Sequence, residues 1–177
     1  FASGRSDLGS NHDDLLADGS GFLIVVIDTG PLVAAADRDD EHNRACTDLL
    51  TGLHLAGRQL LVPAPVVAEV GYLLGRAGGA RVEAGFLRSI VERTFAVVDL
   101  QVVDYDRMAD LVETYADFPL GTTDLAVVAV AERLGISEIA TLDRRHFHAV
   151  PPRHTAAFTI VPEAAVAAGG ERHDLVD

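Results

Sequence analysis

Apolar and polar positions follow one another along this chain in blocks that have the lengths of strands and helices in turn. The apolar run FLIVVI at residues 22–27 has the length of a buried strand and stops at an aspartate. Shorter apolar runs predict further strands at residues 60–62, 95–100, 139–142 and 158–161. Helical spacing of apolar positions predicts helices at residues 31–36, 41–56, 66–75, 80–92, 105–115 and 124–134. This alternation predicts an α/β domain with a mostly parallel, about five-stranded sheet between two helical layers.

The periodic pattern occupies the middle of the chain. Residues 1–21 are rich in Gly, Ser, Asp and Asn without a sustained period, so we expect a flexible polar leader there. Residues 22–162 are expected to form one domain, and residues 163–177 a loose C-terminal tail. A length of 177 residues agrees with a single domain.

The amino-acid composition limits the binding partners and the cellular compartment that we expect. The net charge is −13, from 27 acidic and 14 basic residues, which argues against a broad basic surface for nucleic acid or anionic lipid. The single cysteine excludes an intrachain disulfide and a multi-cysteine zinc site. No apolar run reaches the roughly 18 residues of a membrane span, and no secretory signal is present. We therefore expect a cytoplasmic protein without a membrane partner.

Four acidic residues stand where a solvated carboxylate is not expected. Asp28 and Asp143 each follow the end of a predicted strand, and Asp124 opens a helix that is apolar nearly all round. Glu69 lies at the border of the apolar face of its helix. Each has an ordinary alternative: a turn or helix cap for the three aspartates, and an exposed flank for the glutamate. By contrast, Asp104, Asp106 and Asp110 are expected to be exposed.

Taken together, the four acids indicate a metal site. A parallel sheet brings strand ends and helix N-termini to one edge, where four carboxylates would repel one another strongly. A hard divalent cation neutralises such a group, and Mg²⁺ prefers carboxylate oxygen and water, with Mn²⁺ as a substitute. His146 and His148 have no third ligand nearby in the sequence and do not indicate zinc.

These stretches resemble the PIN-domain ribonucleases, and within them the VapC-type toxins of toxin–antitoxin systems. The resemblance covers residues 24 to about 161. The matching stretches, in order, are VIDTGPLVAAAD, VVAEVGYLL, DFPLGTTDLAVVAVAERLG and IATLDRRHF.

The resemblance implies a PIN-like α/β/α fold and a Mg²⁺-dependent endoribonuclease, the toxin of a type II toxin–antitoxin system. It implies that Asp28, Glu69, Asp124 and Asp143 are the catalytic, metal-binding acids, with Asp143 in a supporting role. Thr29 and Thr123 match small or hydroxylated positions beside the acids. The implied partners are an RNA substrate, a cognate antitoxin and a second copy of the chain in a homodimer.

Two arginines follow the fourth acid. Arg144 and Arg145 are candidates for binding the RNA backbone, because a guanidinium binds phosphate through two hydrogen bonds. The alternative is a pair of solvated arginines in a loop.

Other phosphate chemistries fit less well. Receiver domains, haloacid-dehalogenase-type phosphatases and Walker-type ATPases rely on a lysine, and all 14 basic residues here are arginines. Gly30 also stands where such a phosphatase needs a second aspartate. A non-catalytic PIN-like module that binds RNA or protein stays open, as does the identity of the RNA target.

Overall fold

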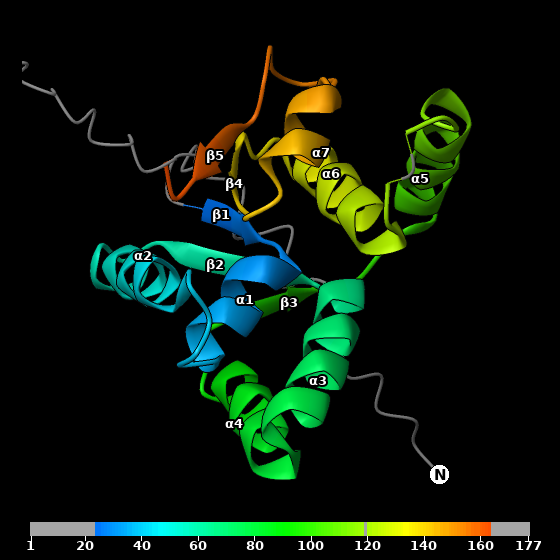
Figure 1. Ribbon diagram of the computed structural model, residues 1–177. Helices are drawn as coiled ribbons and strands as arrows, with labels where there is room; N and C mark the ends of the chain where they lie inside the picture. The colour runs from blue at the N-terminus through cyan, green and yellow to red at the C-terminus, as the bar shows by residue number, and fades with distance from the viewer. Residues whose placement is uncertain (1–23, 119, 164–177) are drawn as a thin grey trace, which may run out of the picture.

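A computed structural model describes residues 24–118 and 120–163 (Figure 1). The leader expected at residues 1–21 and nearly all of the expected tail lie outside these residues. The sheet contains five strands, and every pairing is parallel. The strands, in chain order, are β1 (Ile24–Ile27), β2 (Gln59–Pro63), β3 (Ala96–Val98), β4 (Glu138–Ala140) and β5 (Thr159–Val161). The predicted α/β class and parallel sheet are confirmed.

Helices connect the strands and cover both faces of the sheet (Figure 1). Helices α2 and α6 lie on opposite sides of β1 and β2, while α4 packs on α3 and α5 packs on α6. The helices are α1 (Thr29–Ala36), α2 (Asn43–Leu55), α3 (Ala64–Gly78), α4 (Ala80–Val91), α5 (Val102–Thr114), α6 (Thr122–Leu134) and α7 (Arg144–Ala149). None of the helices in the described ranges is long and apolar enough to cross a bilayer.

The strand order is β3-β2-β1-β4-β5. After β1, the chain adds β2 and β3 on one side of this strand and then β4 and β5 on the other side. The reversal lies between β1 and β4, which are aligned with Ile27 opposite Ala140. In open parallel sheets, ligands bind outside the carboxyl ends of the strands at such a switch point. The residues that follow Ile27 and Ala140 therefore form the centre of the carboxyl edge.

The core explains the two most apolar stretches of the sequence. All four residues of β1 are buried, because helices cover both faces of this central strand. In α6, seven consecutive residues from Leu125 to Ala131 are buried. Gly135 ends this helix in the left-handed conformation, with φ of 67°, as expected for a glycine C-cap.

The sequence did not predict α7, a helix of only six residues that follows the fourth strand. Its first turn depends on a cap from Asp143, whose side chain accepts a hydrogen bond from the backbone N–H of His146. A helix of this length contains too few apolar residues to show the helical period in the sequence.

The expected exposure of Asp104 is wrong, whereas Asp106 and Asp110 are exposed as expected. Asp104 is 1% exposed and pairs with Arg133, whose Nε lies 2.9 Å from Oδ1. Its Oδ2 also accepts a hydrogen bond from the backbone N–H of Gln101 at 2.8 Å, which caps α5. The ion pair joins α5 to α6 across the interface that buries Met108 and Leu111.

We predict that R133A destabilises the protein by about 3 kcal/mol, because it leaves the Asp104 carboxylate buried without its counter-charge. Arg44 provides the control, since it pairs with Asp48 at 3.7 Å on the surface. R44A should cost at most about 0.5 kcal/mol. Urea unfolding followed by circular dichroism measures both, and equal losses would contradict a structural role for the buried pair.

Candidate active site

Asp28 occupies the carboxyl end of the central strand, just before α1. It is 5% exposed, and its backbone N–H continues the sheet by donating to the carbonyl of Ala140 at 2.9 Å. The hydroxyl of Thr141, itself buried, donates to Asp28 Oδ2 at 2.8 Å. Thr141 Oγ1 also accepts a hydrogen bond from the backbone N–H of Asp143 at 3.0 Å, so one hydroxyl connects the ends of β1 and β4.

Burial raises the pKa of the Asp28 carboxyl from 3.8 to about 6. The hydrogen bonds from Thr141 and from the backbone of Thr29 oppose this rise, while the negative charges of Asp124 and Glu69 add to it. A buried carboxylate without a counter-charge favours its protonated form. Asp28 is therefore held where its ionised form is costly, which is the condition that a bound cation relieves.

Asp124 lies in the first turn of α6, beside the same edge. Its Oδ2 accepts a hydrogen bond from the backbone N–H of Gly121 at 3.1 Å, so the capping role is real. Burial nevertheless raises the pKa of the Asp124 carboxyl, and the charges of Asp143 and Glu69 raise it further, against the opposing effects of Gly121 and His146. Asp124 therefore caps α6 and also belongs to the acidic cluster.

Asp143 also has two roles. Its Oδ1 accepts the hydrogen bond from the backbone of His146 at 3.0 Å, and its Oδ2 lies 2.7 Å from Nδ1 of the same residue. That ring nitrogen is also 3.2 Å from Asp124 Oδ2, although neither contact has the alignment of a hydrogen bond. His146, packed edge-on against Phe118 at 5.1 Å between ring centroids, therefore stands between the third and fourth acids.

Glu69 reaches the site from α3 and is the most exposed of the four acids. The hydroxyl of Thr29 donates to Glu69 Oε2 at 2.6 Å. This bond ties the start of α1 to the second turn of α3 and directs the glutamate toward the carboxyl end of β1. The proximity of Thr29 to the acids, expected from the resemblance, is explained by this bond.

Asp28 thus lies within electrostatic reach of Asp124 and Glu69, and Asp124 within reach of Glu69 and Asp143, as their effects on the pKa values of Asp28 and Asp124 show. Within residues 24–118 and 120–163, no three His, Cys, Asp or Glu side chains form a ready-made metal site. The reason is local: Glu69 is turned to Thr29, while Asp124 and Asp143 are turned to His146. Metal binding by the four acids stays a prediction, and it requires rotation of these side chains.

The remaining candidates lie around this cluster. Thr123 occupies the first turn of α6, half-buried. Arg144 donates a hydrogen bond to the carbonyl of Pro162, which ties α7 to the end of β5. Arg145 is exposed, with its guanidinium 5.0 Å from the centre of the Phe118 ring. Of the two arginines, Arg145 is the one whose charge faces solvent near the acids.

Sequence reasoning missed Thr141 and His146. Thr141 directly follows Ala140 at the aligned end of β4, so its position opposite Asp28 needed the strand register. His146 lies three residues after Asp143, a spacing that brings two side chains together only on a helical turn. That turn, α7, was not predicted.

Comparison with known proteins agrees with this geometry. The PIN domain family model matches residues 25–151. Ribonuclease VapC26 of Mycobacterium tuberculosis is 30% identical over 138 residues, which are 78% of this chain and 100% of the relative. The chain therefore belongs to the PIN-domain family, and this relative places it with the VapC-type members.

Solved structures share the fold at lower identity. The crystal structure of Mycobacterium tuberculosis VapC20, described as a sarcin-ricin loop cleaving toxin, has a TM-score of 0.61 at 16% identity over 68% of this chain and 91% of that one. VapBC2 from Rickettsia felis, bound to promoter DNA, has a TM-score of 0.56 at 16% identity over 72% and 93%. A toxin–antitoxin complex from Klebsiella pneumoniae has a TM-score of 0.54 at 18% identity over 72% and 92%.

The raised pKa of Asp28 predicts how stability depends on pH in the absence of metal. The folded state holds the proton of the Asp28 carboxyl more tightly than the unfolded state does. Its protonation therefore contributes fully to the free energy of unfolding below about pH 4, and this contribution is lost as the pH rises through about 6. D28N keeps the acceptor for Thr141 and removes the charge. At pH 7.5 in EDTA, D28N should be more stable than the parent chain by about 1–3 kcal/mol. The upper limit corresponds to a pKa shift of about two units at about 1.4 kcal/mol per unit.

At pH 4 the two proteins should have equal stability. Thermal and urea unfolding at both pH values measure the difference, with D106N as an exposed control that changes nothing. A D28N protein that is less stable at pH 7.5 would show that the carboxylate is not strained in the folded state.

Proposed function

We propose that this protein is a Mg²⁺-dependent endoribonuclease, the toxin of a type II toxin–antitoxin pair, that hydrolyses RNA phosphodiester bonds. The observation that carries the proposal is the group of acids at the switch point: burial raises the pKa of both Asp28 and Asp124, and the charges of neighbouring acids raise it further. A cluster of partly buried carboxylates is a typical binding site for a hard cation.

The chemistry of the donors fits Mg²⁺, with Mn²⁺ as a substitute. The four side chains offer only carboxylate oxygens, the ligand type that both ions prefer. Asp124 Oδ1 and Asp28 Oδ1 are not used in the hydrogen bonds that hold these two residues by their Oδ2 atoms. Asp28 and Asp124 would hold the ion, and Glu69 and Asp143 would complete the site or hold water beside it.

When bound, Mg²⁺ lowers the pKa of water and stabilises negative charge on phosphate oxygens. The chain's own residues do the rest. Thr141 fixes the orientation of Asp28, and Thr29 fixes that of Glu69. His146 lies between Asp124 and Asp143, with Nδ1 3.2 Å from Asp124 Oδ2 and 2.7 Å from Asp143 Oδ2. Cleavage by activated water produces a 5′-phosphate and a 3′-hydroxyl and does not use the RNA 2′-hydroxyl as nucleophile.

The surface near the acids supplies the contacts to RNA. Arg145 presents its guanidinium to solvent over Phe118, an arrangement in which the cation binds phosphate while the ring offers a stacking face. Arg144 contributes less to phosphate binding, because its guanidinium already bonds the Pro162 carbonyl. With a net charge of −13, binding should be weak and sensitive to salt.

We predict that RNA cleavage requires Mg²⁺ or Mn²⁺ and stops in excess EDTA. D28N and D124N should each reduce the rate at least about 100-fold, because each removes a charge that holds the ion. D106N is the control, since this exposed aspartate lies on α5 outside the site. A labelled RNA mixture, with the new 5′ ends mapped, measures the rate and the end chemistry.

Cleavage that persists in EDTA would overturn the metal mechanism. RNA binding without cleavage at any Mn²⁺ concentration would favour the non-catalytic PIN module.

Exposed apolar side chains support two protein partners. On α3 and α4, Tyr72 is 60% and Leu87 45% exposed, and these helices form the face where we propose that an amphipathic antitoxin helix binds. On α5, the exposed residues Val102, Tyr105 and Val112 recur at i, i+3 and i+10, which makes one stripe along the helix. We propose this stripe as the homodimer face.

The two faces predict separable variants. Y72E/L87E should lose inhibition by the antitoxin that accompanies the protein in its host, while cleavage and dimerisation stay intact. V112E should lower the mass measured by light scattering to that of a monomer and leave inhibition in place. If V112E also abolishes inhibition, or Y72E/L87E also breaks the dimer, the assignment of the two faces is wrong.

A further inference from the structure

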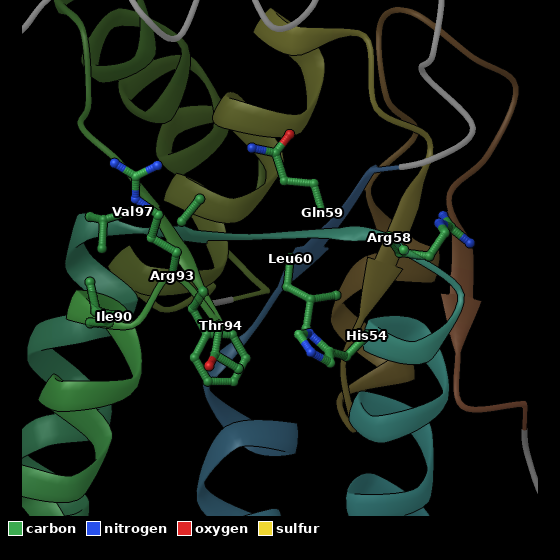
Figure 2. Close-up of a pocket in the computed structure, with 11 residues that line it drawn as sticks. His54, Arg58, Gln59, Leu60, Ile90, Arg93, Thr94 and Val97 are labelled. Atoms are coloured by element: carbon green, nitrogen blue, oxygen red, sulfur yellow. The ribbon is translucent and has the colours of Figure 1, made fainter.

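A cavity of about 540 Å³ lies at the opposite edge of the sheet from the acids. We call it the amino-edge pocket, because it surrounds the points where β2 and β3 begin. Figure 2 shows Arg58, Gln59 and Leu60 at the start of β2, with Arg93 and Thr94 just before β3. The pocket thus has no part in the proposed metal site, and nothing above assigns it a role.

The walls of the pocket combine an apolar floor with a basic rim. Leu60, Ile90 and Phe95 supply apolar surface, and His54, Arg58 and Arg93 supply the basic groups. Its lining, as far as residues 24–118 and 120–163 define it, contains no aspartate or glutamate. This is unusual in a chain with 27 acids and 14 bases, and it indicates an anionic occupant with an apolar part.

The charge of the rim is only partly neutralised. Arg58 pairs with Glu138 at 2.9 Å, so its charge is balanced. Arg93 is exposed, and in the described part of the chain it has no carboxylate within 4.0 Å. Arg93 also has a φ of 61°, a backbone conformation that is uncommon for a residue other than glycine. The pocket therefore presents the exposed guanidinium of Arg93 beside partly buried apolar side chains.

The part of the chain that precedes β1 carries a segment whose sequence is complementary to this pocket. Arg58 donates a hydrogen bond to the carbonyl of Ile24 at 3.4 Å, so the point where residues 1–23 join the sheet lies at the pocket rim. Those residues contain four aspartates and one arginine, and residues 13–18 read DDLLAD. Two leucines flanked by aspartates match an apolar floor with a basic rim.

The distance is within reach. Arg93 lies about 10 Å from Ile24 across two strand spacings, since neighbouring strands are about 4.8 Å apart. The six residues from position 18 to Ile24 span up to about 20 Å when extended. Tethering raises the effective concentration of such a segment to the order of millimolar, which favours binding within one chain over binding between chains.

We propose that residues 13–18 dock into the amino-edge pocket of their own chain, with the leucines on the apolar floor and the aspartates facing Arg93 and His54. Occupation of this pocket would leave the acids at the carboxyl edge free, because the two sites lie at opposite edges of the sheet. This docking does not depend on nuclease activity or on a bound metal.

Hydrogen–deuterium exchange on the full 177-residue chain tests the proposal in low salt. Amides at residues 54–60 and 92–97 should exchange several-fold faster in D13R/D14R/D18R than in the parent chain. R93E should have the same effect, and combining R93E with D13R/D14R/D18R should restore slow exchange, because the charges are then reversed on both sides. R81E is the matched control on α4, away from the pocket, and should change nothing there.

Unchanged exchange of α6 in every variant shows that each one is folded. Equal exchange at residues 54–60 and 92–97 in the parent chain and in D13R/D14R/D18R would overturn the proposal. Protection that increases with protein concentration would also overturn it, since the occupant would then come from a second copy. Protection that appears only when an RNA oligonucleotide is added would identify the pocket as an RNA site instead.

Discussion

Repulsion between carboxylates at the switch point of the sheet is the constraint on which this structure depends. The central strand ends at Asp28, and the strand order places the fourth strand beside it, so the topology itself brings the acids together. Burial is the larger part of the cost, because a carboxylate removed from water loses its hydration. Burial first, and then the charges of Asp124 and Glu69, raise the pKa of Asp28 to about 6 in the absence of a cation.

Ordinary structural bonds hold the acids in this unfavourable arrangement. Asp124 and Asp143 each cap a helix with one oxygen, and Thr141 and Thr29 donate hydroxyls to Asp28 and Glu69. The bond from Thr141 restricts Asp28 before any ligand arrives, which reduces the entropy lost on binding, whereas Glu69, Asp124 and Asp143 must turn from their present partners to reach a metal. The caps therefore do not compete with a role in the site, since a carboxylate has two oxygens.

Four arginines of this lysine-free chain are half-buried and hold elements of the fold together: Arg58, Arg107, Arg133 and Arg144. Arg107 and Arg133 pair with acids at the α5–α6 side, and Arg58 joins β4 to the start of β1 and β2. A guanidinium suits such partly buried pairs because it forms several hydrogen bonds in a fixed plane. The exposed arginines include Arg145, near the acids, and Arg93, at the opposite edge of the sheet.

The sequence by itself determined the α/β class and, within a few residues, the strands and every described helix except α7, and it singled out the four acids as candidates. It did so because burial on both sides of a parallel sheet demands continuous apolar strands, and an acid at the end of such a strand breaks the pattern. Only the tertiary structure decided the contacts of those acids. Thr141 and Asp28 are 113 residues apart, and Arg133 is 29 residues from Asp104, the aspartate whose burial the sequence did not predict. Local patterns report local geometry, whereas these partners meet only once strand order and register are fixed.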